Sequence, residues 1–427
     1  MARSRWGRWS LSRTVSSLRY RNFRLLFLGS IVSHTGDFVQ AMAQSWLVWT
    51  MTGSPFLLGL IGFSQALPRL LLGAIGGAIV DRLDRRQLLV VTQNLAMVQA
   101  FVFWALVYFG LITFWHIFFL VLFLGTVNTL NQTARQSLIN SLVPREELMN
   151  AIALNSSVVN LSKVIGPSLG GVLIAIIGVD GCLLVNAVSF LAIILSLLMM
   201  DLPPWQREKG EDNFWQEVGE GYNYIKTNRR VFSVLFLAYI VALIGSPYSR
   251  FLPVFASDIL HAGPLGFGFL LAAPGLGAVI SGLCLASMGN IRRRGNFIFI
   301  SVFSFSLFLI LFSFSRSMLF SLPCLVMVGA SHIAFRAIAN ATIQMETPPH
   351  LLGRILSLFL MDKGLWSFGT LFIGSFASLL GTPSAIALSG FICALSAAAL
   401  LYHRTLQRQE MRKGLEELPL DSKIGLR

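Results

Sequence analysis

Five charged residues are crowded into the ten-residue segment from Gly77 to Arg86, between two apolar stretches that are each long enough to cross a bilayer. A loop this short reverses the chain only if 56–80 and 87–109 are antiparallel helices. The charges must then lie in water at the membrane face, because a charge in hydrocarbon is costly. This pattern predicts a multi-pass membrane protein, and among such proteins it favours a transporter.

Composition agrees with lipid as the solvent of the fold. Of the 427 residues, 55% are hydrophobic and only 12% are charged, with a mean hydropathy of +0.70. About twelve runs reach the roughly 20 apolar residues that a spanning helix needs. They are too long for barrel strands, so the expected fold is all-α, with twelve transmembrane helices in two pseudo-symmetric six-helix bundles. The predicted spans begin near Phe23, Phe56, Gln87, Thr113, Asn150, Gly181, Val231, Leu265, Phe297, Met318, Leu352 and Thr382.

The distribution of charge explains the net charge of +14. Basic residues gather in the amino-terminal segment and in every second loop, whereas the intervening loops hold almost none, with Arg316 the main exception. By the positive-inside rule this pattern predicts that both termini are cytoplasmic. Membrane topology accounts for the basic residues, so we expect no nucleic-acid partner.

A single long polar stretch divides six spans from six. We expect a basic cytoplasmic segment over 1–22, a first bundle over 23–201, a cytoplasmic linker over 202–230, a second bundle over 231–403 and a cytoplasmic tail over 404–427. In the linker Phe214, Val218 and Tyr222 recur at helical spacing. This indicates an amphipathic helix on the membrane face, with a solvated linker helix as the alternative.

The two halves read as degenerate copies. The loop after Gly77 corresponds to 282–294, which keeps a basic cluster but has Ala286 where Asp81 would stand. The glycine-rich run at 166–171 corresponds to 369–374.

Polar side chains inside the predicted helices are the candidates for substrate and proton binding. In the first helix His34, Asp37, Gln40 and Gln44 share about a third of the circumference. Asp37 lies near mid-span and is our candidate protonation site, while His34 either relays its proton or is a neutral packing histidine. Arg69, one turn from Gln65 in the second helix, is a candidate ion-pair partner of Asp37, and substrate or proton would then compete with Arg69 for Asp37. The alternative is a static ion pair that only orders the first two helices.

Four further helices carry polar residues that we expect to line the transport path. Arg135 and Arg336 lie close to predicted cytoplasmic ends, so a gate or headgroup contact is the alternative for both. Asp362 and Lys363 are adjacent and cannot face one direction. The full candidate set from these helices is Asn128, Gln132, Arg135, Asn160, Lys163, His332, Arg336 and Asp362.

These motifs resemble those of the major facilitator superfamily, and the chain is most similar to its drug–proton antiporter branch, which includes enterobactin and macrolide exporters. The loop signature between helices two and three is matched by Gly77, Asp81, Arg82, Arg85 and Arg86, with Asp84 in place of a customary glycine. The antiporter signature of helix five is matched by Gly166, Pro167, Gly170 and Gly171. Further similarity at Arg21–Arg24, Gly36–Asp37, Arg135–Gln136 and Gly353–Arg354 extends it along most of the chain.

The resemblance implies a secondary transporter in a bacterial inner membrane that works by alternating access. It implies that the loop signature is a conformational latch, with Asp81 near Arg354 at the start of helix eleven, the alternative being charges that only fix topology. The bend at Pro167 is implied to disfavour a proton leak and so to favour antiport.

The expected function is therefore proton-coupled efflux of amphiphilic small molecules such as drugs or siderophores, a multidrug-resistance type of activity. We expect a monomer in contact with membrane lipid, driven by the proton gradient without a cofactor or metal. The alternative is an importer or uniporter of a polar solute or lysolipid. No cluster of catalytic side chains and no phosphate-binding loop favours an enzyme or scramblase.

Overall fold

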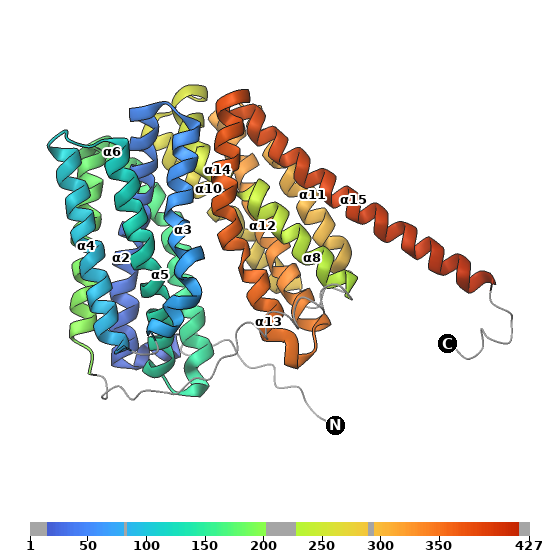
Figure 1. The fold of residues 1–427 in the computed structure, drawn as a ribbon, viewed down its shortest axis with the longest axis horizontal. Coiled ribbons are helices and arrows are strands. Elements are labelled where there is room, and N and C mark those ends of the chain that lie inside the picture. The colour runs from blue at the N-terminus through green and yellow to red at the C-terminus, as the bar shows by residue number, and fades with distance from the viewer. Residues whose placement is uncertain (1–14, 81–82, 202–227, 289–293, 418–427) are drawn as a thin grey trace.

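The computed structural model describes residues 15–80, 83–201, 228–288 and 294–417, which form helices and no strand (Figure 1). Asp81 and Arg82 and the linker with its expected amphipathic helix at 214–222 lie outside the described residues, as do 1–14 and 418–427. The side chains of Arg354 and of residues 73–80 are likewise outside this description.

The amino-terminal group of helices follows a short 3₁₀ turn at Ser16–Arg19, and a second turn at Arg145–Glu147 precedes its last helix. Gly178 interrupts that last helix with φ 75° and ψ 179°, a conformation that glycine adopts readily. The helices are α2 (Arg21–Thr52), α3 (Pro55–Val80), α4 (Arg85–Tyr108), α5 (Phe114–Leu142) and α6 (Leu148–Leu198).

The carboxy-terminal group begins with a helix that changes its winding several times. α8 (Arg229–Ile240) continues through a π-helical turn, η3 (Val241–Gly245), a 3₁₀ segment, η4 (Ser246–Phe251), α9 (Leu252–Val254) and a second π turn, η5 (Phe255–Ile259). Pro247 and Pro253 lie in this stretch, where each lacks a backbone N–H for the regular ladder. The remaining helices are α10 (Gly263–Met288), α11 (Arg294–Ser313), α12 (Met318–Glu346), α13 (Pro349–Leu360), α14 (Asp362–Leu380) and α15 (Thr382–Glu417).

The predicted span starts agree with these bounds to within a few residues, with two differences. The span expected from Leu352 is divided at Met361 between α13 and α14, and the fifth and sixth spans are joined in α6 across Gly178. Within the described residues, ten helices are long and apolar enough to cross a membrane, and the polar α2 is not among them.

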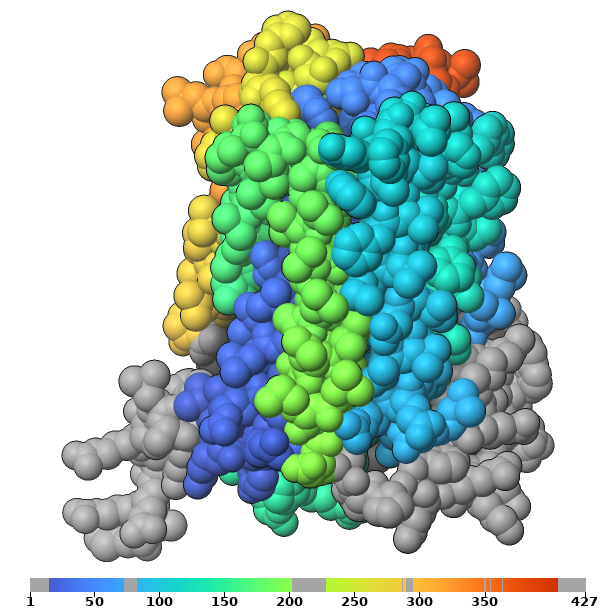
Figure 2. All heavy atoms as spheres, turned by 90° about the vertical axis from the view of Figure 1, so that its left-hand side faces the viewer, coloured from blue at the N-terminus to red at the C-terminus, as the bar shows by residue number. Residues whose placement is uncertain are grey.

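The outer face of the amino-terminal group is apolar, as a lipid-facing surface must be. α4 and the later part of α6 form this face in the side view (Figure 2). Each carries a stripe of exposed aliphatic side chains at helical spacing, Val91, Leu95, Val98 and Val102 on α4 and Val188, Leu191, Leu195 and Leu198 on α6.

The two groups meet along α3 with α14 and along α6 with α10. Their ribbons lie side by side at the end where α14 joins α15 and diverge toward the end where α13 lies (Figure 1). Glycines permit the close approach: a Cβ at Gly59 would lie 2.3 Å from the carbonyl oxygen of Thr370, and one at Gly171 would lie 2.9 Å from that of Pro264.

Gly166 and Gly170 of the helix-five signature contact α2 within the amino-terminal group. A Cβ at Gly166 would lie 2.5 Å from Cβ of Phe38, and one at Gly170 would lie 2.9 Å from Sδ of Met42. The glycine–proline segment of α6 therefore packs directly against the residues that follow Asp37.

Candidate functional site

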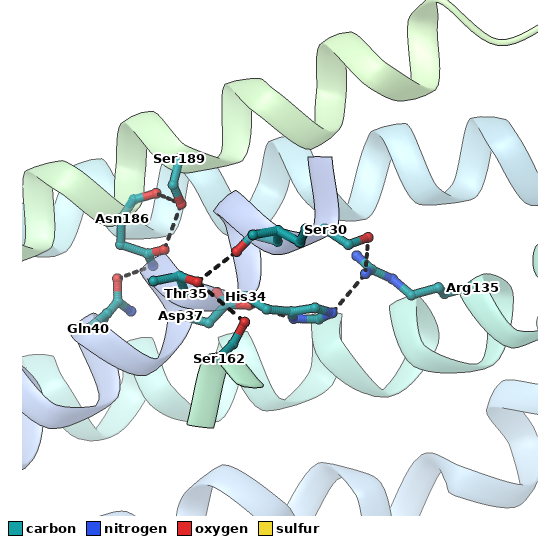
Figure 3. Close-up of polar contacts among 10 residues, drawn as sticks. Ser30, His34, Thr35, Asp37, Gln40, Arg135, Ser162, Asn186 and Ser189 are labelled. Carbon is teal, nitrogen blue, oxygen red and sulfur yellow. Dashed lines mark hydrogen bonds and ion pairs between the residues drawn. The ribbon is translucent and has the colours of Figure 1, made fainter. Parts of the chain in front are cut away.

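The polar face of α2 is the centre of the candidate site (Figure 3). Arg135 reaches from α5 and donates hydrogen bonds to Oγ of Ser30 at 2.9 Å and to Nε2 of His34 at 2.8 Å. Nδ1 of His34 in turn faces Oδ2 of Asp37 at 3.5 Å. The three charged or titratable groups thus form one continuous chain, Arg135–His34–Asp37.

The hydrogen bond from Arg135 determines the tautomer of His34. A guanidinium nitrogen only donates, so Nε2 of His34 must accept the hydrogen bond from Arg135. The ring is therefore neutral, with its proton on Nδ1 toward Asp37. Arg135 is buried, whereas the side chain of Asp37 is 42% exposed and that of His34 is 21% exposed, so the chain runs from a buried cation to an accessible carboxylate.

A second, neutral network lies one turn further along α2. Asn186 on α6 donates to Oε1 of Gln40 at 2.8 Å, and Oγ of Ser189 lies 3.0 Å from Oδ1 of Asn186. A Cβ at Gly36 would lie 2.3 Å from Oγ of Ser189, so the glycine admits this pair against α2. Asn186 was not among the predicted site residues, although an asparagine inside an apolar run is a visible signal. Gln44, which was, is buried.

The expected ion pair between Asp37 and Arg69 is not formed. Asp37 faces His34 instead, and Arg69 is exposed on α3 and makes no ion pair or hydrogen bond among the described residues. Gln65, one turn before Arg69, accepts a hydrogen bond from Arg250 of the carboxy-terminal group.

The polar stripe expected on α5 is divided by its neighbours. Asn131 donates to Oγ1 of Thr92 on α4 at 2.9 Å and is buried, as Arg135 is. Asn128 and Gln132 are exposed. These four residues therefore lie in two environments, buried for Asn131 and Arg135 and exposed for Asn128 and Gln132.

On α6, Asn160 and Lys163 are exposed on the face that meets α10, where a Cβ at Gly275 would lie 2.5 Å from Cγ2 of Val164. The charge of Lys163 acts on the ring of His332 in the carboxy-terminal group. Asn160 and Lys163 thus lie where the two groups of helices meet.

The carboxy-terminal group holds a direct ion pair between Arg336 on α12 and Asp362 at the start of α14. The Asp362 side chain is only 2% exposed, and its Oδ1 is buried without a hydrogen-bond partner. The guanidinium lies 5.5 Å from the Phe359 ring centre. His332, one turn before Arg336, lies 3.5 Å from Oγ of Ser246 and 5.8 Å from the Phe305 ring.

Part of the predicted latch can be placed. Asp84 caps α4 by accepting a hydrogen bond from the backbone N–H of Gln87 at 3.0 Å. Arg86 donates to the carbonyl oxygens of Leu197 and Leu198 at 2.8 and 2.7 Å, which places a cation at the carboxyl end of α6. Arg85 opens α4, the backbone of Gly77 is in the last turn of α3, and the expected contact of Asp81 with Arg354 lies outside the described residues.

Arg250 in η4 joins the two groups of helices and was missed as a site residue. It donates to Oγ of Ser45 on α2 at 3.1 Å and to Oε1 of Gln65 on α3 at 2.8 Å. Its guanidinium also lies 5.6 Å from the Trp366 ring of α14. The sequence does show an arginine inside an apolar run, but its partners lie in the other half of the chain.

A second contact between the groups is made by Nε1 of Trp49, which donates to Oδ1 of Asp258 at 3.3 Å.

Among the described residues, no group of three His, Cys, Asp or Glu side chains is arranged to hold a metal ion.

The helical architecture and its intramembrane polar chains define a membrane transporter of the major facilitator type. Solved structures of similar fold include a bacterial homologue of the human lysosomal transporter Spinster in an inward-facing, unoccupied conformation, with a TM-score of 0.71 at 16% identity over 91% of this chain and 98% of that one. The nucleoside transporter NupG gives a TM-score of 0.70 at 14% identity over 89% of this chain and 98% of its own.

The chain belongs to the transmembrane secretion effector family (MFS_3), whose model matches residues 12–419. It is 21% identical to the staphyloferrin A transporter of Staphylococcus aureus, over 86% of this chain and 92% of that protein. It is 22% identical to macrolide efflux protein A of Streptococcus pyogenes, over 80% and 86%. It is 25% identical to an enterobactin exporter of Shigella boydii, over 86% and 88%. The resemblance to this superfamily is thereby confirmed, and the protein is a transporter, not an enzyme.

Proposed function

We propose that this protein exports amphiphilic small molecules in exchange for protons, and that Asp37 carries the coupling proton. The observation that carries the proposal is the chain Arg135–His34–Asp37, which connects a buried cation to an accessible carboxylate through a neutral histidine. The relatives named for the efflux of macrolides and the export of enterobactin support the outward direction.

The proposed architecture has twelve spans in two six-helix bundles. It follows when α6 is counted as two spans that meet at Gly178 and the polar α2 is counted as a span in addition to the ten apolar helices. The basic amino-terminal segment and alternate loops support a cytoplasmic position for both termini and a bacterial inner membrane as the location. In this orientation the groups of helices are in contact on the outer side, as in an inward-facing state.

Protonation of Asp37 would change the balance of the whole chain. The carboxylate is the only acidic member, so its neutralisation removes the negative charge that faces His34 and compensates buried Arg135. Because a buried cation without a counter-charge is unfavourable, protonation of Asp37 would favour a rearrangement of α5, which carries Arg135, against α2. A substrate group that approaches Arg135 or His34 would compete with Asp37 in the same way.

The packing of α6 gives this local change a route to the rest of the bundle. Phe38, the residue after Asp37, contacts the Cα of Gly166, and Pro167 follows it in a helix that lacks one backbone hydrogen bond there. Gly171, further along the same helix, contacts the carboxy-terminal group at Pro264. A shift of α2 at Asp37 would therefore displace α6, which contacts the carboxy-terminal group.

The test uses inverted membrane vesicles that are acidic inside, with a pH-sensitive dye to report proton release as macrolides, dyes and siderophores are added. Compound-dependent release in the wild type and its loss in Asp37→Asn are the expected results. Asp201→Asn is the matched control, because Asp201 is an exposed carboxylate that pairs with Arg21 away from α2's polar face.

Two outcomes contradict the proposal. Release that persists in Asp37→Asn would remove Asp37 from the coupling mechanism. Absence of release with every compound, combined with uptake of a polar solute or lysolipid, would establish an importer or uniporter instead.

A further inference from the structure

Arg250 is a buried cation that is held by neutral groups. The residue is 9% exposed, and its two terminal nitrogens donate to the hydroxyl of Ser45 and the side-chain amide of Gln65. Its Nε is buried without a hydrogen-bond partner and faces Gly62, where a Cβ would lie 3.1 Å away. Within the described ranges no salt bridge includes Arg250.

Such a site is costly unless the cation has a use. Removal of a guanidinium from water is compensated only in part by neutral acceptors and by the ring of Trp366 at 5.6 Å. Two other arginines within the helices differ: Arg336 has Asp362, and Arg135 has His34 and the charge of Asp37. Arg250 therefore retains an unused capacity to bind an anion.

A second cation lies on the same face of α3 as a partner of Arg250. Arg69 is one turn beyond Gln65, which accepts a hydrogen bond from Arg250, and it is exposed and makes no ion pair among the described residues. Lys163 is exposed on the face of α6 that meets α10 in the other group of helices. Among the candidate-site residues described here the cations are Arg69, Arg135, Lys163, Arg250 and Arg336, whereas the carboxylates are Asp37, Asp362 and, by Trp49, Asp258.

We infer that the exported compound is an anion, with carboxylate or similarly acidic groups, and that Arg250 is a residue that selects it. An anion would supply the counter-charge that the described surroundings of Arg250 lack, and a bidentate contact would use the guanidinium better than two neutral acceptors do. A cationic drug would instead meet like charge from Arg250 and Arg69.

The role of Arg250 follows from where its partners lie. Ser45 and Gln65 belong to the amino-terminal group, whereas Arg250 belongs to the carboxy-terminal group. Separation of the two groups on the side where they now touch would free both terminal nitrogens at once. The anion would take the place of Ser45 and Gln65 as Arg250 is released, which links substrate binding to opening. This inference rests on the proposed export function, since the bound compound is taken to be the exported one.

The experiment measures equilibrium binding to the purified full chain in detergent, without a proton gradient. The probes are carboxyfluorescein, an anion, and rhodamine 123, a cation on a closely related ring system, and fluorescence anisotropy reports both. Wild-type protein is expected to bind carboxyfluorescein more tightly. In Arg250→Gln the affinity for carboxyfluorescein should fall by roughly tenfold or more, the loss of a hydrogen bond to a charged group, while that for rhodamine 123 is unchanged or higher.

Controls keep the result interpretable. Arg250→Lys retains the charge and should bind carboxyfluorescein with an affinity between the other two. Arg69→Gln changes an exposed residue that does not hold the groups together, so it should fold and still lose several-fold affinity for the anion. Arg316→Gln removes an exposed arginine of the loop between α11 and α12 and should bind both dyes as the wild type does.

The inference is overturned if the wild type binds the two dyes equally, prefers the cation or fails to bind the anion. It is also overturned if Arg250→Gln and Arg69→Gln weaken both dyes alike, which would make Arg250 a clamp between the groups only. The two proposals fail separately: anion binding without proton release in vesicles would contradict antiport, whereas proton release with cations alone would contradict the anion site.

Discussion

Arg135 of the amino-terminal group and Arg336 of the carboxy-terminal group are each connected to a carboxylate, but in different ways. In the carboxy-terminal group Arg336 contacts the carboxylate of Asp362 directly, and that side chain is 2% exposed. In the amino-terminal group Arg135 reaches Asp37 only through the ring of His34, and the carboxylate is 42% exposed. The carboxylate of the first pair is closed to water, whereas that of the second is accessible to it.

The difference separates a structural pair from a pair that can exchange a proton. A buried, direct ion pair resists protonation, because the departure of either charge leaves the other uncompensated. An accessible carboxylate that is connected through a neutral ring can gain a proton from water, and Arg135 then loses its distant counter-charge but still has Ser30 and His34 as hydrogen-bond acceptors. We therefore expect mutations in the two regions to affect different properties.

The largest effect on stability is expected for Arg336→Ala. It leaves Asp362 buried and unpaired, which costs about 3–5 kcal/mol and should lower the thermal unfolding transition of the purified protein strongly. The double variant Arg336→Ala/Asp362→Ala removes both charges and should recover much of this loss. An unchanged transition in the single variant would show that water compensates Asp362, contrary to its burial.

Asp37→Asn and Asp362→Asn sharpen the comparison, because they make the same chemical change in the two regions. Asp37→Asn should alter the free energy of unfolding by less than about 1 kcal/mol, as is usual for an exposed charge, yet abolish compound-dependent proton release. Asp362→Asn should destabilise the fold but retain release per folded molecule. Loss of release in Asp362→Asn, with release retained in Asp37→Asn, would reverse the assignment.

Replacement of His34 tests whether the connection itself matters. His34→Phe removes the acceptor for Arg135 and the donor toward Asp37, and should cost about 1–3 kcal/mol because a buried charged donor loses a partner. His34→Gln offers an amide oxygen and an amide N–H in similar places, so it should retain more of both stability and proton release. His403→Gln, an exposed histidine of α15, serves as the control in thermal unfolding and vesicle assays. Equal behaviour of the Phe and Gln variants would make His34 a packing residue.

Much of the fold was predictable because hydropathy and helix length are local properties. The helices begin close to the positions expected from Phe56, Gln87 and Thr113, and Thr113 is the amino-terminal cap of α5. The continuity of α6 across Gly178 and the altered winding of α8 to η5 were not predicted, since both depend on how glycine and proline are used within otherwise apolar runs.

The candidate site was predictable in its members and much less in its pairings. Spacing placed His34 and Asp37 on one face of α2, as the structure confirms, but proposed Arg69 as the partner where the structure has Arg135 through His34. Arg250 was missed because it is defined by Ser45 and Gln65, which are distant in sequence. Helical periodicity reports which residues share a face, whereas partners across helices depend on rotation and depth that a single sequence does not contain.

The smallest effect is expected for Ser30→Ala, which tests how firmly the amino-terminal chain depends on its histidine. Arg135 loses one hydrogen bond of 2.9 Å but keeps that to His34, so we expect a loss of about 0.5–1.5 kcal/mol in stability. Proton release should persist, because the connection to Asp37 is intact. Ser33→Ala is the control for the loss of a hydroxyl, because Ser33 is a buried serine on the same helix that makes no hydrogen bond to Arg135. If Ser30→Ala abolished proton release, as Asp37→Asn is expected to, then Ser30 would position Arg135. The ring of His34 would then no longer explain the difference between the Arg135–His34–Asp37 chain and the direct Arg336–Asp362 pair.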